Sequence, residues 1–205
     1  MKTQKNIEVE VRGPLTKEQR DQLVEIFERE GKREKTKNRV LIDYSERIEE
    51  GKEREKDIRI RSTNGVPEII VKLGNWGGSE ARKELSVTTA PASFDTLASL
   101  FAALGYVRGV LCVRRTEVFV YKDIEFALVE VPGHSFHFEA EKMAHEGEDA
   151  HMLLAEIEAV CASLGLTVYS KEEFFEYVQI LNKEANEEFV FDSANETYFR
   201  DRFGI

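Results

Sequence analysis

Apolar and charged residues alternate strictly near the start of the chain, in the segment 7–12 with the sequence IEVEVR. Successive side chains of an extended strand point to opposite faces, so this segment predicts a strand with one apolar and one charged face. The charged face carries Glu8, Glu10 and Arg12. A second alternating segment near position 140 places His137, Glu139 and Glu141 on one face. Neighbouring carboxylates on one face repel each other unless a cation lies between them.

Between these two acidic strands, the polar faces of the predicted strands are basic. Their basic residues are Arg59, Arg61, Lys72 and Arg82, and Arg82 shares its face with Glu84. The whole pattern predicts strands over residues 5–13, 33–45, 57–62, 67–73, 81–88, 108–121, 124–131 and 135–142. Pro14 is expected to end the first strand, because proline lacks the backbone N–H that a ladder needs. The pair Asn64-Gly65 is typical of a tight hairpin turn between the third and fourth strands.

Four helices are predicted from apolar residues at helical spacing and from capping residues. They begin at Thr16, Ser93, Asp149 and Ser170, and the first three end near Gly31, Leu104 and Leu164. The first and the last are expected to carry capping boxes, with Gln19 and Glu173 as the partners of Thr16 and Ser170. The second helix is expected to bury Phe94, Leu97, Leu100, Phe101 and Leu104.

Three segments carry no predicted helix or strand. Residues 46–56 form a dense charge run, for which a mobile, solvated loop is expected. Residues 74–79 form a glycine-rich loop around Trp76 that lacks the lysine of a phosphate-binding P-loop. Trp76 is expected near an entrance to the site, either stacked on a ring of the ligand or packed on the rim. Residues 182–205 are unassigned, but their aromatic side chains indicate docking onto the core rather than a free tail.

Two arrangements of the charged faces fit this pattern. In a half-solvated sheet the charges would merely face water. The apolar stripes of the helices, however, need the apolar strand faces as partners, and if the helices cover the outside of a closed sheet, the charged faces line its inside. The pattern alone leaves both arrangements open. Eight strands joined mostly by hairpins predict an α+β fold, an eight-stranded antiparallel β-barrel with helices packed outside, in one domain over 1–205 with a core over about 5–181 and a C-terminal extension over 182–205. A tunnel lined by both signs of charge predicts a bound anion and a divalent cation.

Composition and charge narrow the function classes. The net charge of −10 argues against general binding of nucleic acid, which needs a basic surface. No apolar stretch is long enough to span a membrane, and the N-terminus shows no secretory signal. Cys112 and Cys161 lie among apolar residues, as reduced core thiols do. These features together predict a cytoplasmic protein, a monomer or homodimer, with no nucleic-acid or membrane partner.

The charged motifs, taken in order, resemble those of the CYTH family, also called triphosphate tunnel metalloenzymes. The matching segments are Glu8-x-Glu10-x-Arg12, Arg59-x-Arg61, Lys72, Arg82-x-Glu84, Arg114-Arg115, Gly133 with residues 138–141, and residues 177–181. Three positions depart from the family pattern. Arg12 replaces a lysine, Val129 replaces an aspartate, and the lysine before the last basic residue is Val113 if Arg115 is the match, or Cys112 if Arg114 is.

The resemblance implies a tunnel that binds a triphosphate compound together with Mg²⁺ or Mn²⁺. By matching positions, the metal ligands would be Glu8, Glu10, Glu139 and Glu141. The substrate would contact Arg12, Arg59, Arg61, Lys72, Arg82, Glu84 and one of Arg114 or Arg115. The residues expected to carry catalysis are Glu8, Glu10, Arg59, Arg61 and Lys72.

The family contains several activities, so three functions are carried forward. The first is metal-dependent hydrolysis of inorganic, nucleoside or thiamine triphosphate. The second is a class IV adenylyl cyclase, which would convert ATP to cyclic AMP and pyrophosphate; the absent aspartate at Val129 and the lack of a recognisable adenine site make hydrolysis the preferred prediction. The third is a triphosphate-binding module with little turnover. A separate zinc site among His134, His137, His145 and His151 matches no known ligand spacing and is disfavoured.

Overall fold

The computed structural model describes residues 7–45, 56–74, 80–145 and 148–205. Within these residues the strands are β1 (Ile7–Leu15), β2 (Lys32–Asp43), β3 (Lys56–Thr63), β4 (Val66–Leu73), β5 (Glu80–Thr88), β6 (Arg108–Tyr121), β7 (Ile124–Val131), β8 (Ser135–Ala144) and β9 (Glu187–Val190). The helices are α1 (Lys17–Glu30), α2 (Phe94–Ala103), α3 (Ala150–Ser163), α4 (Lys171–Glu184) and α5 (Tyr198–Phe203). The expected loop at 46–55, and Trp76 within 75–79, lie outside the described residues.

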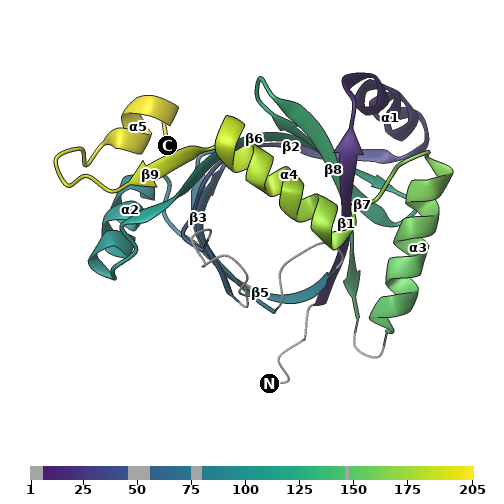
Figure 1. Ribbon diagram of the computed structural model, residues 1–205, viewed down its shortest axis with the longest axis horizontal. Helices are drawn as coiled ribbons and strands as arrows, with labels where there is room; N and C mark the ends of the chain where they lie inside the picture. The colour runs from purple at the N-terminus through teal and green to yellow at the C-terminus, as the bar shows by residue number, and fades with distance from the viewer. Residues whose placement is uncertain (1–6, 46–55, 75–79, 146–147) are drawn as a thin grey trace.

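The strands form one antiparallel sheet that closes on itself. Their order is β2-β3-β4-β5-β1-β8-β7-β6, and a further pairing of β2 with β6 joins the two ends. β9 pairs only with the start of β6 and therefore lies outside this ring of eight strands. The predicted barrel with helices outside is confirmed, and Figure 1 looks into it. Asn64 and Gly65 both have positive φ at the β3–β4 turn, as the hairpin prediction requires.

The first strand does not end at Pro14. β1 continues to Leu15, and Pro14 lies opposite His137 of β8. On its other side, β1 pairs with β5 only from Ile7 to Glu10. Proline is tolerated there because, among the described residues, no strand pairs with β1 on that side at this point, so no ladder hydrogen bond from its nitrogen is needed.

Helices α1 and α3 cover one side of the barrel. The capping boxes of α1 and α4 are both formed, with Thr16 and Ser170 as the capping residues. Leu23 and Phe27 of α1, and Leu153 and Ile157 of α3, are buried against the outward apolar residues of the neighbouring strands. This packing holds the apolar strand faces outside and turns the charged faces inward.

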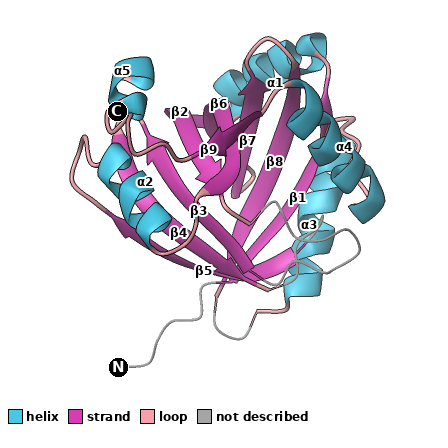
Figure 2. Ribbon diagram, turned by 60° about the vertical axis from the view of Figure 1, so that its left-hand side comes forward, coloured by secondary structure: helices cyan, strands magenta, loops and turns pink. Residues whose placement is uncertain are grey.

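A second apolar cluster lies at the other side of the barrel, where α2, β9 and α5 gather (Figure 2). The prediction for α2 is correct for Phe94, Leu97 and Phe101 but wrong for Leu100 and Leu104, which are 47% and 66% exposed. Only a narrow stripe of α2 faces the sheet, and these two leucines project beyond it.

The C-terminal segment docks on the core, as its aromatic residues indicated. Phe199 is 1% exposed and packs against Phe94, with ring centroids 4.6 Å apart. The carboxylate of Asp95 accepts hydrogen bonds from the backbone N–H groups of Phe199 and Arg200 at 2.8 and 3.1 Å. These contacts tie the first turn of α5 to α2. No helix in the described part of the chain is long and apolar enough to cross a membrane.

Candidate active site

The charged strand faces line the interior of the barrel. They surround a cavity of about 570 Å³ whose walls come from both acidic strands and from the basic strands between them. A smaller cavity of about 160 Å³ adjoins it and shares Arg12, Arg39, Arg59, Arg61 and Glu139 with the larger one. Helix α4 lies across this end of the tunnel (Figure 1) and contributes Phe174, Tyr177 and Leu181 to the smaller cavity. The alternative in which these charges face open water is therefore excluded.

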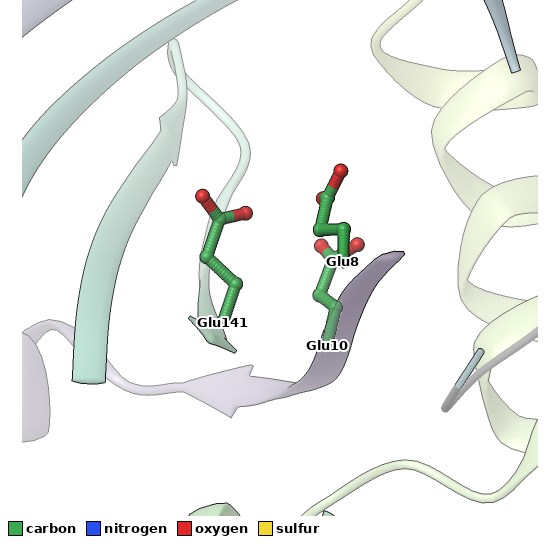
Figure 3. Close-up of side chains that lie close together, drawn as sticks. All are labelled: Glu8, Glu10 and Glu141. Atoms are coloured by element: carbon green, nitrogen blue, oxygen red, sulfur yellow. The ribbon is translucent and has the colours of Figure 1, made fainter. Parts of the chain in front are cut away.

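Three carboxylates converge at one side of the larger cavity. Glu8 and Glu10 project from β1 and Glu141 from β8, and each offers an oxygen within 4.8 Å of the others (Figure 3). The strand register explains the cluster, because Glu10 lies directly opposite Glu141 and Glu8 is two residues away on the same face. Among the acidic, histidine and cysteine side chains of the described residues, only these three lie close enough together to hold one metal ion.

The charges of this cluster are only partly compensated. Burial, together with the neighbouring carboxylates, raises the pKa of Glu10 to about 7 and that of Glu141 to about 9. Burial acts on Glu8 as well, but the ammonium of Lys72, 3.2 Å away, outweighs it and lowers the pKa of Glu8. Two of the three groups thus bind a proton more readily than an ordinary glutamate, and a positive charge between them would favour their ionised forms.

A hard divalent cation fits this donor set. Mg²⁺ and Mn²⁺ take oxygen ligands, and three carboxylates within reach of one point supply them. Mg²⁺ also keeps several waters when proteins bind it, so three protein oxygens leave room for oxygens of a phosphate.

The fourth predicted metal ligand, Glu139, lies in a different environment. Its carboxylate accepts a hydrogen bond from Nε of Arg12 at 3.3 Å, and Nε2 of His137 lies 3.9 Å from it. Although burial opposes the effect, His137 and Arg12 hold the pKa of Glu139 well below its usual range. Arg12 also pairs with Glu10 at 2.5 Å, so its guanidinium links Glu139 to the carboxylate cluster.

Three of the predicted basic residues, Arg59, Arg61 and Lys72, line the larger cavity, and each is paired with an acid. Arg59 donates to Asp57 at 2.8 Å, and Arg61 donates to Glu68 at 2.7 Å. Lys72 lies 3.2 Å from both Glu8 and Glu84. Arg82 lies on β5 opposite Glu8 in the register, and its side chain is outside the described residues.

The alternation of side chains along β6 decides whether Arg114 or Arg115 faces the tunnel. Arg114 faces the smaller cavity and donates to Oδ1 of Asn186 at 2.8 Å, whereas Arg115 is exposed on the outer face. Cys112 therefore occupies the tunnel position two residues before the arginine, and it is buried. Val129 lines the same cavity. His137 also faces this cavity, with Nδ1 3.2 Å from the hydroxyl of Tyr177.

Several tunnel residues were missed in the sequence. Lys37 and Arg39 lie on β2, and Asp43 and Asp57 flank Arg59. The neighbours of Lys37 on β2 are Thr36 and Asn38, so the strand lacks the alternation of apolar and charged residues that revealed the others. The period of two among Lys35, Lys37 and Arg39 was the available signal.

Comparisons with solved structures give the same fold. The chain resembles the PH1819 protein from Pyrococcus horikoshii, with a TM-score of 0.63 and 22% identity over 84% of this chain and 98% of that one. It also resembles a candidate adenylate cyclase from Vibrio parahaemolyticus, with a TM-score of 0.58 and 15% identity over 83% and 98% of the two chains. A third structure is that of HpAC1 from Hippeastrum, a candidate adenylyl cyclase described as having a dominant triphosphatase activity, with a TM-score of 0.54 and 15% identity over 88% and 99%.

No protein-family model matches the sequence, and no curated protein matches it. At these identities the structural matches bear on the fold and leave the activity to be argued from the site. The closed antiparallel sheet, the charged tunnel and the ordered motifs agree with one another and with these neighbours. The chain has the CYTH, or triphosphate tunnel, fold.

Proposed function

We propose that this protein is a metal-dependent triphosphatase that hydrolyses a triphosphate compound inside the tunnel. One observation carries the proposal: the larger cavity has a cluster of three carboxylates on one wall and arginine and lysine side chains on the others. A triphosphate with its divalent cation complements both parts, because the cation binds carboxylate and phosphate oxygens together.

In this proposal Glu8, Glu10 and Glu141 hold the Mg²⁺ or Mn²⁺, and Glu139 supports them through Arg12. The cation, when bound, neutralises phosphate charge in the transition state. The phosphate oxygens are bound by Arg12, Arg61 and Lys72. Their positions on the strands assign the same role to Arg82 and Arg114. Glu84 holds Lys72 in position. Arg59, anchored by Asp57, presents its remaining N–H groups to the substrate.

The proposed reaction is in-line attack of water on the terminal phosphorus. The bond from that phosphorus to its bridging oxygen breaks, the leaving diphosphate departs with the electron pair, and the attacking water releases a proton to the solvent. Such a transfer depends on positioning and on charge neutralisation more than on covalent catalysis by the protein. Carboxylates hold the basic side chains of the tunnel in place. The site is therefore preorganised for phosphoryl transfer, and little reorganisation is needed when charge shifts along the phosphates.

A second candidate is cyclisation of ATP, which the Vibrio neighbour's description favours. Cyclisation requires that the ribose hydroxyl be aligned with the α-phosphorus, and this demands a tight grip on the nucleoside. Val129 in the smaller cavity offers neither a metal ligand nor a hydrogen bond for that purpose. Hydrolysis makes no such demand and is therefore preferred.

The test is incubation of the protein with ATP, thiamine triphosphate and inorganic triphosphate, each with Mg²⁺ or Mn²⁺, followed by separation of the products. Release of orthophosphate from at least one substrate, abolished in Glu10→Gln, is expected. An Arg108→Met variant, altered on β6 outside the tunnel, is the control and should keep its activity. Formation of cyclic AMP and pyrophosphate from ATP would establish the cyclase instead. Tight binding without turnover would favour a binding module.

A further inference from the structure

Arg39 is a tunnel arginine without a described partner. It lies half-buried on β2, and its Nε atom is buried without a hydrogen bond. Its neighbours in the tunnel are compensated, by the pairs Arg12 with Glu10, Arg59 with Asp57, Arg61 with Glu68, and Lys72 with Glu8. Among the described residues, none forms an ion pair with Arg39 or accepts a hydrogen bond from it. A buried charge persists when it is paired or bound to something, so an anion from outside the chain fits this position.

The position of Arg39 in the barrel supports this reading. It lines both cavities and lies directly opposite Arg114 of β6 in the strand register. Arg114 has neutral partners, the side-chain oxygen of Asn186 and the carbonyl oxygen of Val113. Like charges opposite each other on neighbouring strands are destabilising. Burial and the nearby Arg61 also lower the pKa of Arg39, so the ligand-free tunnel disfavours its charge.

We propose that Arg39 and Arg114 form an anion subsite between the two cavities, and that it takes the phosphoryl group farthest from Glu8, Glu10 and Glu141. The identity of the anion as a phosphoryl group rests on the proposed function. The carboxylate cluster borders only the larger cavity, whereas Arg39 borders both, so a triphosphate bound at the carboxylates extends toward this pair. A guanidinium binds two phosphate oxygens at once, which a lysine cannot do.

Thermal unfolding separates this role from a structural one. Arg39→Met removes a buried charge that lacks a described partner and keeps the aliphatic volume, so the ligand-free variant should unfold at the same or a higher temperature than the wild type. Arg61→Met, the matched comparison, strips Glu68 of its cation and should unfold at a lower temperature. A clear fall in the unfolding temperature of ligand-free Arg39→Met would show that Arg39 supports the fold and would overturn the proposal.

Calorimetry tests the subsite directly, with Mg²⁺ and a triphosphate analogue whose bridging oxygens are replaced by methylene groups. Loss of a charge-assisted contact should weaken binding of the analogue about 10- to 100-fold in Arg39→Met. Arg39→Lys keeps the charge but loses the planar guanidinium, which donates two parallel hydrogen bonds. This variant should bind the analogue with intermediate affinity. Arg108→Met should bind like the wild type, since it lies on β6 away from the tunnel.

The outcomes distinguish the subsite from the reaction. Unchanged affinity of Arg39→Met for the analogue would overturn the subsite while the triphosphatase could stand. Binding of orthophosphate that depends on Arg39, with no turnover of any triphosphate, would establish the subsite and overturn the proposed function. Failure of the wild type to bind either the analogue or orthophosphate would overturn both.

Discussion

Glu10 and Glu141 lie directly opposite each other on the paired strands β1 and β8, with both carboxylates inside the barrel. Like charges in such a cross-strand pair are destabilising. The neighbouring guanidinium of Arg12 pairs with Glu10, and no described cation forms an ion pair with Glu141. The pair therefore makes the empty tunnel sensitive to pH and to divalent cations.

The first prediction concerns that sensitivity. The pKa values of about 7 for Glu10 and about 9 for Glu141 lie above the ordinary value of 4.5. Between about pH 4.5 and pH 9 these two carboxyls thus bind more protons in the folded protein than in the unfolded chain, so their contribution to stability falls as the pH rises. Burial lowers the pKa of His137, which acts in the opposite direction but only below about its ordinary value of 6.5. The unfolding temperature of the metal-free protein should be lower at pH 9 than at pH 6. The lowered pKa values of Glu8 and Glu139 act below this window.

Mg²⁺ should reverse this trend, because it competes with protons for the same carboxylates. The rise in unfolding temperature on adding Mg²⁺ should be larger at pH 9 than at pH 6. Glu141→Gln is the matched variant and should flatten the pH dependence of the metal-free protein. An Mg²⁺ effect that is equal at both pH values would contradict the assignment of the cluster as a cation site.

The second prediction separates Glu10 from Glu139. Glu10→Gln removes one member of the acidic cluster, so it should abolish both turnover and stabilisation by Mg²⁺ while the metal-free protein is no less stable. Glu139→Gln should instead destabilise the metal-free protein. Arg12 pairs with both carboxylates, but His137 and Arg12 together hold the pKa of Glu139 well below its usual range, whereas burial raises that of Glu10 to about 7. Differential scanning calorimetry with and without Mg²⁺ measures both effects. Equal loss of Mg²⁺ stabilisation in the two variants would place Glu139 among the metal ligands.

The third prediction concerns the anchoring of Arg59. Asp57 is 1% exposed and accepts hydrogen bonds from Nε and Nη2 of Arg59. Asp57→Asn should lower the free energy of unfolding by about 1.5–3 kcal/mol, the range for a hydrogen bond to a charged group. Urea denaturation measures the loss. A stability equal to that of the wild type would mean that the tunnel holds Arg59 by other contacts.

The fourth prediction compares two leucines of α2. Leu97 is 6% exposed within the second apolar cluster, whereas Leu104 is 66% exposed. Leu97→Ala should cost about 2–5 kcal/mol of stability because it leaves a cavity. Leu104→Ala should change stability by no more than about 0.5 kcal/mol. Denaturant unfolding of the two variants side by side checks the distinction, and a large loss in Leu104→Ala would contradict it.

The fifth prediction concerns the C-terminal segment. Phe199 is nearly completely buried between α2 and β9, where its ring contacts those of Phe94 and Phe189. Phe199→Ala should reduce the free energy of unfolding by about 3–5 kcal/mol. Exposed Glu196, three residues earlier, supplies the control, since its replacement by alanine removes no buried surface. A negligible effect of Phe199→Ala would show that α5 docks without stabilising the domain.

The sequence by itself determined the eight strands of the barrel and which of their faces are charged, but not β9, which lies in the unassigned segment 182–205. A period of two over residues 7–12 and again around Glu139 identifies the strands that carry the carboxylates, because side-chain direction in a strand follows from the backbone alone. The apolar stripes of α1 and α3 then require the apolar strand faces as partners, which leaves the charges inside. The capping boxes and the Asn64-Gly65 turn were likewise readable, since they depend on residues within a few positions of each other.

Only the tertiary structure decided which charges meet. The register of β1 on β8 brings Glu10 to Glu141 and leaves Glu139 beside Arg12, and no local pattern fixes a register between residues so distant in the sequence. The exposure of Leu104, the burial of Phe199 and the lack of a described partner for Nε of Arg39 also depend on how separate elements pack. Periodicity describes one element at a time, whereas pairing of charges is a property of the space between elements.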